Sequence, residues 1–147
     1  MVWRLLMPRY RPIPSYDRRL AAAAQIALVE AARRLLGDRA IIGFSTHNLN
    51  QAEEAVRLPI DYLAFGPIFM TATKENPDPI VGLTELAQVK NSAGSLPLVA
   101  IGGISPEAIR EVLMSGADSV AIISAVLNRA HPIAENLRNV QHLSILA

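Results

Sequence analysis

Four short apolar segments constrain this chain most, because each is followed by small or hydroxyl residues and then by a helical pattern. They are centred near residues 41, 62, 98 and 119. Apolar runs that alternate with helical segments are typical of βα units, and they predict a parallel sheet buried on both faces and flanked by helices. Four units are half of an eight-stranded βα barrel, which ordinarily takes about 250 residues. An open flavodoxin-like sheet is the geometric alternative.

The chain of 147 residues divides into an irregular arm and one folded domain. Three prolines interrupt residues 1–16, whereas an alanine-rich helical pattern begins at Asp17, so the domain spans residues 17–147. The patterns within it predict strands at 40–44, 61–65, 96–101 and 118–123, and helices at 17–36, 49–58, 83–89, 106–115 and 125–128, the last resuming after Pro132. Residues 66–81 are expected to form a long loop. Asn48, with Gln51 three residues later, and Ser105, followed by Pro106, are the expected N-caps.

Composition favours a folded protein with a buried core and excludes several function classes. Hydrophobic residues make up 51% and charged residues 18% of the chain. A net charge of +1 gives no electrostatic drive toward nucleic acid or an anionic membrane. The absence of cysteine excludes disulfides and thiol chemistry. No apolar run is long enough to span a bilayer, and the first residues lack the features of a signal peptide, so we expect a cytoplasmic protein.

Residues suited to bind phosphate follow all four predicted strands. Because the carboxyl ends of parallel strands meet at one edge of the sheet, these residues are expected to lie together. They are Ser45 and His47, then Thr71, Thr73 and Lys74, then Gly102 and Gly103, and finally Ile123 and Ser124. Glycine lets a ligand approach the backbone closely, hydroxyls donate to phosphate oxygens, and a lysine supplies positive charge. The pattern predicts a site for a phosphorylated substrate.

Structural explanations for the same residues stay open. The two glycines are also explained by close packing of a helix on the sheet, and the segment containing Lys74 by an ordinary polar loop. For His47 a role in a capping turn is favoured over catalysis. No cluster of histidines, cysteines or carboxylates has the spacing of a metal site, so no metal ligand is predicted.

Four motifs together resemble the thiamine-phosphate synthase family. They are residues 42–47 (IGFSTH), 64–74 (AFGPIFMTATK), 99–104 (VAIGGI) and 122–125 (IISA), in the order and spacing of that family. The resemblance implies a βα barrel of the TIM type. It implies a transferase of thiamine biosynthesis that joins hydroxymethylpyrimidine diphosphate to thiazole phosphate, releasing pyrophosphate with the help of Mg²⁺. The related thiazole tautomerases carry a catalytic histidine where this chain has Pro67, which favours the synthase.

The resemblance also implies a role for each matched residue. Thr71 and Thr73 would contact the thiazole, and Gly102, Gly103, Ile123 and Ser124 would belong to the site for its phosphate. Lys74 would bind the departing pyrophosphate, where it stabilises the charge that develops in the transition state, and Ser45 would lie beside the pyrimidine diphosphate. We therefore assign Lys74 and Ser45 to catalysis and the other six residues to substrate binding.

Only the C-terminal half of the family pattern is present. The opening strand, the basic strand for the pyrimidine diphosphate and two aspartates for Mg²⁺ are not recognisable, and Asp17, the nearest carboxylate, stands in a different context. The sequence thus predicts a partial barrel that binds thiazole phosphate without turnover by this chain alone. A non-catalytic phosphate-binding remnant and a partner of a separately encoded half-barrel are the alternatives. Open sheet edges predict a homo-oligomer.

Overall fold

The fold alternates helices with strands along the chain. The computed structural model describes residues 18–71, 78–128 and 131–145, so the predicted arm at 1–16 lies outside the described residues. The elements are α1 (Arg18–Leu36), β1 (Gly43–Thr46), α2 (Leu49–Ala55), β2 (Tyr62–Phe65), α3 (Gly82–Ala93), β3 (Leu98–Ile101), a 3₁₀ turn (Pro106–Ala108), α4 (Ile109–Met114), β4 (Ser119–Ala121) and α5 (Ile133–Ile145).

The four strands form one parallel sheet in the order β1-β2-β3-β4. Ser45 of β1 pairs with Ala64 of β2, Ala64 pairs with Val99 of β3, and Val99 pairs with Ser119 of β4. Each strand therefore lies beside the next one in the sequence, with a helix crossing between them. This arrangement is a partial βα barrel of four units, which confirms the predicted fold class.

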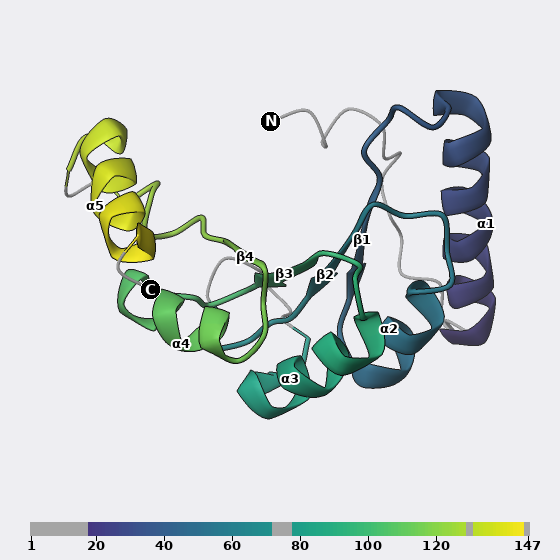
Figure 1. Ribbon diagram of the computed structural model, residues 1–147, viewed down its shortest axis with the longest axis horizontal. Coiled ribbons are helices and arrows are strands. Elements are labelled where there is room, and N and C mark those ends of the chain that lie inside the picture. Colours follow the sequence, from purple (N-terminus) through teal and green to yellow (C-terminus); the bar gives the residue numbers. More distant parts are fainter. Residues whose placement is uncertain (1–17, 72–77, 129–130, 146–147) are drawn as a thin grey trace.

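Among the described residues, helices cover only one face of this sheet, so the expectation of strands buried on both faces holds for β2 and is wrong for the edge strands β1 and β4. Helices α2, α3 and α4 lie along one side of the curved sheet, while α1 and α5 stand at its two ends (Figure 1). The covered face carries the buried residues Leu63, Phe65, Leu98 and Ala100, and on the other face Gly43, Ser45, Ser119 and Ala121 are exposed. The physical reason is that four strands cannot close into a barrel, so no opposing strands cover the inner face.

Several predicted boundaries change in the structure. The first strand begins at Gly43 rather than at residue 40, and the helix predicted at 125–128 is a turn in which the N–H groups of Val126 and Leu127 donate to the carbonyl of Ile123. The cap at Asn48 is confirmed, because its Oδ1 accepts a hydrogen bond of 2.9 Å from the N–H of Gln51. A short apolar run predicts that a strand is present more reliably than it predicts the first and last residues of that strand.

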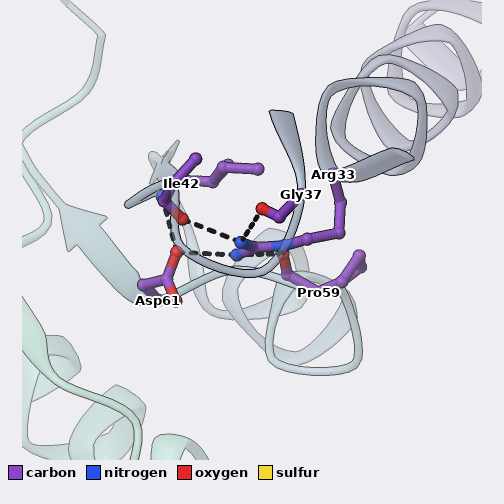
Figure 2. Close-up of polar contacts among 6 residues, drawn as sticks. Arg33, Gly37, Ile42, Pro59 and Asp61 are labelled. Carbon is purple, nitrogen blue, oxygen red and sulfur yellow. Dashed lines mark hydrogen bonds and ion pairs between the residues drawn. The ribbon is translucent and has the colours of Figure 1, made fainter. Parts of the chain in front are cut away.

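Arg33 of α1 fastens the helix to the amino ends of β1 and β2. Its guanidinium donates to the carbonyls of Gly37, Ala40 and Pro59, and to Oδ2 of Asp61 at 2.6 Å (Figure 2). The same Asp61 oxygen accepts from the N–H of Ile42, also at 2.6 Å. The Ile42 N–H and the guanidinium together hold the pKa of Asp61 below its ordinary value. One arginine fork thereby fixes three chain segments relative to each other.

Asp118 repeats this arrangement one pair of strands later. It stands directly before β4, accepts two hydrogen bonds from Nζ of Lys90 on α3 at 2.9 and 2.7 Å, and accepts a third from the N–H of Leu98 at the start of β3. The Lys90 ammonium and the Leu98 N–H lower the pKa of Asp118. An aspartate directly before one strand thus ties that strand to the neighbouring strand and to the helix that precedes the neighbouring strand.

Among the described helices, none combines the length and the apolar character needed to cross a bilayer.

We expect Asp61→Asn to lower the free energy of unfolding at neutral pH and to flatten its dependence on acidic pH. Because the folded-state pKa of Asp61 lies below its ordinary value of 3.8, its stabilisation is present above that value and is lost as pH falls through the lowered pKa. Urea unfolding from neutral to acidic pH measures this difference. Asp38→Asn, in the exposed loop before β1, should keep the pH profile of the unchanged chain. An identical profile for Asp61→Asn would contradict the prediction.

Candidate functional site

Loops that follow β2, β3 and β4 meet around one cavity at the carboxyl edge of the sheet. Its volume is about 440 Å³, and it is lined by Met70, Thr71, Gly103, Ile104, Ser105, Pro106, Ser124 and Ala125. The structure therefore brings together three of the residues predicted from separate motifs: Thr71, Gly103 and Ser124. Ile123 is 60% exposed and does not line this cavity. Thr73 and Lys74 lie outside the described residues.

Gly102 and Gly103 allow the loop after β2 to cross over the end of β3. The N–H of Ile68 donates to the carbonyl of Ile101 at 3.0 Å, and the N–H of Phe69 donates to that of Gly102 at 3.1 Å. Gly103 has φ +70°, and a Cβ there would lie 2.4 Å from the carbonyl oxygen of Met70. The glycine pair thus makes room for a neighbouring loop, and this contact directs Thr71 toward the cavity.

Ser124 reaches the cavity from a turn rather than from the start of a helix. The expected helix after β4 begins only at Ile133, and the turn at Ile123 is closed by backbone hydrogen bonds of 3.2 and 2.9 Å. Ser124 is exposed, so its hydroxyl is accessible to a ligand in the cavity. A phosphate there would be held by hydroxyl and backbone N–H donors.

Ser105 stands at the N-cap with Pro106 after it, as expected, but it does not cap through its side chain. It occupies the N-cap position with extended backbone, yet its side chain makes no capping hydrogen bond. Its hydroxyl instead donates to the carboxylate of Glu107, and this hydrogen bond is the main reason that the pKa of Glu107 is lowered. The Glu107 carboxylate also accepts from the backbone N–H of Glu107, one of the first-turn donors that a capping side chain at Ser105 would otherwise satisfy.

Ser45 lies in a different hollow, of about 470 Å³, which also includes Phe44, His47, Asn48 and Gln51 among its lining residues. This hollow shares no lining residue with the cavity around Gly103. The structure therefore does not bring Ser45 into contact with Thr71, Gly103 and Ser124.

His47 ties the end of β1 to the loop after β2. Its Nδ1 is 2.6 Å from the carbonyl oxygen of Gly66, which requires that Nδ1 carries the proton and donates it, and it is 3.7 Å from Oδ2 of Asp78. The N–H of His47 donates to the side chain of Gln51 at 2.9 Å. These contacts agree with the favoured role in a capping turn, and the bond to Gly66 is a contact that sequence reasoning missed. No local sequence pattern predicts a contact between His47 and Gly66, which lie 19 positions apart.

The described residues do not fit a magnesium site. Mg²⁺ binds through carboxylate and other oxygens in octahedral geometry, and no group of three or more carboxylate, histidine or cysteine residues suited to a metal ion occurs among residues 18–71, 78–128 and 131–145. Charged side chains are likewise absent from the described lining of the cavity around Gly103. We therefore derive no step through a metal ion.

Comparison with known proteins identifies the family. The family model described as thiamine monophosphate synthase matches residues 24–126, a region that includes the whole sheet and both hollows. The chain belongs to this family. The match confirms the resemblance given by the four motifs.

Curated relatives are named thiamine-phosphate synthase, and their chains are longer than this one. The thiamine-phosphate synthase of Koribacter versatilis is 51% identical over 98 residues, which are 67% of this chain and 46% of the relative. That of Dictyoglomus turgidum is 40% identical over 116 residues, or 78% of this chain and 51% of the relative. The chain thus spans about half the length of the curated relatives it matches.

Solved structures agree on the fold. Thiamine phosphate pyrophosphorylase from Pyrococcus furiosus superposes with a TM-score of 0.68 and 32% sequence identity, over 80% of this chain and 55% of that one. A 3-hexulose-6-phosphate synthase superposes with a TM-score of 0.56 at 18% identity and supports the fold alone.

We expect Gly103→Ala to lower the free energy of unfolding by about 1–3 kcal/mol more than Gly37→Ala, as is usual when extra volume is forced into a packed region. Both glycines have positive φ, +70° and +74°, so the backbone strain is matched. Only at Gly103 would the new Cβ collide with backbone, because nothing lies within 4 Å at Gly37. Urea denaturation measures both variants, and equal losses would show that the close approach at Gly103 is unimportant.

Proposed function

We propose that this chain forms the thiazole-phosphate-binding half of an enzyme that joins hydroxymethylpyrimidine diphosphate to thiazole phosphate. The proposal rests on one observation: Thr71, Gly103 and Ser124 come from three separate loops and line one cavity. Its volume of about 440 Å³ lies in the range of small-molecule sites. The described lining offers hydroxyls and backbone N–H groups and contains no carboxylate, which suits an anionic phosphate ester better than a cation.

The chemistry of the proposed reaction assigns distinct tasks to the two sides of the site. The bond between the pyrimidine methylene carbon and the pyrophosphate oxygen breaks, and its electron pair leaves with pyrophosphate. The lone pair of the thiazole nitrogen then forms a bond to the resulting carbocation. The cavity at Gly103 holds the thiazole phosphate so that its nitrogen is oriented for this step, because correct orientation removes much of the entropic barrier.

Lys74 and Ser45 complete the proposal on the side of the leaving group. Lys74 lies three residues after Thr71 in the sequence, and its ammonium would stabilise charge that grows on the pyrophosphate as the bond breaks. Ser45 would contact the pyrimidine diphosphate from the hollow beside β1. No described residue is assigned to the Mg²⁺ that the family resemblance implies, because no group of three or more metal-ligating side chains occurs in the described part of the chain.

A non-catalytic phosphate-binding protein is the second candidate. It is supported by the described lining of the cavity, which offers hydroxyls to a phosphate and contains no charged side chain that could act on a reacting group. The two candidates differ in pyrophosphate release, which only the enzyme produces. The predicted homo-oligomer and cytoplasmic location stay predictions under either candidate.

We expect the purified chain to bind thiazole phosphate and to release no pyrophosphate when pyrimidine diphosphate and Mg²⁺ are added. The cavity for the phosphate is present, whereas a magnesium site is not found in the described part of the chain. Isothermal titration calorimetry measures binding, and a coupled pyrophosphate assay measures turnover. Failure to bind thiazole phosphate would contradict both candidates, and turnover comparable to that of a full-length relative would overturn the second.

We expect Ser124→Ala to weaken the binding of thiazole phosphate roughly ten- to hundredfold, the usual cost of removing a hydrogen bond to a charged group. Ser124 is exposed and lines the cavity, so the substitution should leave stability unchanged. Ser95→Ala, exposed in the loop before β3, is the matched control and should bind as the unchanged chain does. Equal affinities for both variants would remove Ser124 from the proposed site.

A further inference from the structure

Asn136 on α5 is a buried polar residue that the sites described above do not use. It is 4% exposed, and the other buried polar residue in the described part of the chain is Thr46. The hydroxyl of Thr46 bonds within the sheet, where it donates to the carbonyl of Ala64 at 3.1 Å. A buried amide costs free energy unless its polar atoms are hydrogen-bonded. The partners of Asn136 therefore indicate its role.

The side-chain amide of Asn136 faces the segment that follows β4. Its Nδ2 lies 3.1 Å from the carbonyl oxygen of Val126, 3.4 Å from that of Asn128 and 3.3 Å from that of His131. Carbonyl oxygens only accept hydrogen bonds, so three of them around one atom require the NH₂ group at this place and not the amide oxygen. One side chain of α5 thus holds the backbone of the turn after β4.

The turn that Asn136 holds is also the turn that carries Ser124. It is closed by the N–H groups of Val126 and Leu127, which both donate to the carbonyl of Ile123. Ser124 lies within this turn and lines the cavity around the glycine pair. The strand that leads into the turn, β4, is paired on one side in the described sheet, so strand pairing holds it less firmly than it holds β3. The hydrogen bonds from Asn136 add a restraint that the sheet does not supply.

Helix α5 also packs against a second part of the cavity wall. It contacts α4, beside which it stands in Figure 1, and the 3₁₀ turn Pro106–Ala108. Ser105 and Pro106, at the start of that turn, line the cavity. Val140, four residues after Asn136, packs against the hydrophobic core, so the face of α5 that carries Asn136 is turned inward. The packing of α5 thus gives the amide a fixed position from which to hold the turn after β4.

We propose that Asn136 is a positioning residue for the phosphate site: its amide fixes the turn after β4, and this turn fixes the hydroxyl of Ser124 in the cavity. The proposal rests on the function proposed above, because that function assigns Ser124 to a phosphate ester. A hydroxyl that is held in place before the ligand arrives loses less conformational freedom on binding, which strengthens the affinity. Asn136 does not line the cavity, so its effect on binding passes through the turn.

Two matched variants on one helix test this role. Asn136→Ala removes the amide that holds the turn, and Asn139→Ala removes an exposed asparagine three residues later on α5. We expect Asn136→Ala to weaken the binding of thiazole phosphate roughly five- to twentyfold, the affinity equivalent of one or two hydrogen bonds. Asn139→Ala should bind as the unchanged chain does. Calorimetry measures both affinities under conditions in which circular dichroism shows both variants to be folded.

A double-mutant cycle shows whether Asn136 acts through Ser124. In a chain that already carries Ser124→Ala, the effect of Asn136→Ala should fall to about twofold or less, because substitutions that act through the same contact are not additive. A residue that only stabilises the fold would not show this coupling. An undiminished effect of Asn136→Ala in that background would overturn the proposal.

Hydrogen exchange without ligand separates this proposal from the proposed function. The N–H groups of Val126 and Leu127 close the turn, so they should exchange faster in Asn136→Ala than in Asn139→Ala. Faster exchange in a chain that does not bind thiazole phosphate would support the hold of Asn136 on the turn and contradict the proposed function. Equal exchange in the two variants would overturn the positioning role whether or not the ligand binds.

A measurement on the unchanged chain decides the case in which Asn136→Ala does not fold. The nuclear magnetic resonance signals of the side-chain NH₂ group of Asn136 should shift when thiazole phosphate binds, because the turn that this group holds contacts the ligand. The signals of Asn139, which is exposed on the same helix, should not shift. Asn136 signals that stay in place while the ligand binds would overturn the proposal.

Discussion

Two aspartates at the amino ends of strands hold this structure together, and the rest of the fold depends on them. Asp61 and Asp118 each precede a strand and accept the N–H of a residue where the neighbouring strand begins. Each also binds a cation from the helix that precedes that neighbouring strand, Arg33 of α1 or Lys90 of α3. Both ion pairs are partly exposed, with Asp61 40% and Asp118 45% accessible, so their charge attraction alone contributes little. The two aspartates act mainly through geometry. Their hydrogen bonds from backbone N–H groups fix the register of neighbouring strands at the amino edge of the sheet.

Fixing the amino edge leaves the carboxyl edge free to be shaped by loops. At that edge the contacts are backbone to backbone, as between Phe69 and Gly102, and the shape of the cavity is set by where a side chain is absent. Gly103 shows this most clearly, since a single methyl group there would displace the loop that carries Thr71. Stability and binding are therefore divided between the two ends of the same strands, as is usual for barrels of this type.

Sequence reasoning predicted the βα class of the fold and three of the residues that line the cavity. The four strands, their parallel sheet and the cap at Asn48 follow from local patterns, and the family motifs contain Thr71, Gly103 and Ser124, which line one cavity. The predictions failed where contacts outside the local pattern decide the structure. Ser105 stands at the N-cap but makes no capping hydrogen bond, and the edge strands are exposed on one face of the described sheet. No local sequence pattern indicates that Ser45 lies outside the cavity. None indicates that Arg33 bonds to residues as distant in the sequence as Pro59 and Asp61.

The candidate residues belong to strands that are held with different firmness. Gly103 follows β3, which is paired on both sides, whereas Ser45 lies in β1 and Ser124 follows β4, the two edge strands of the described sheet. A strand paired on one side only is held less firmly than a central strand. A ligand that contacts Gly103 and Ser124 together would therefore join an edge strand to a central one, and its binding would order the turn after β4.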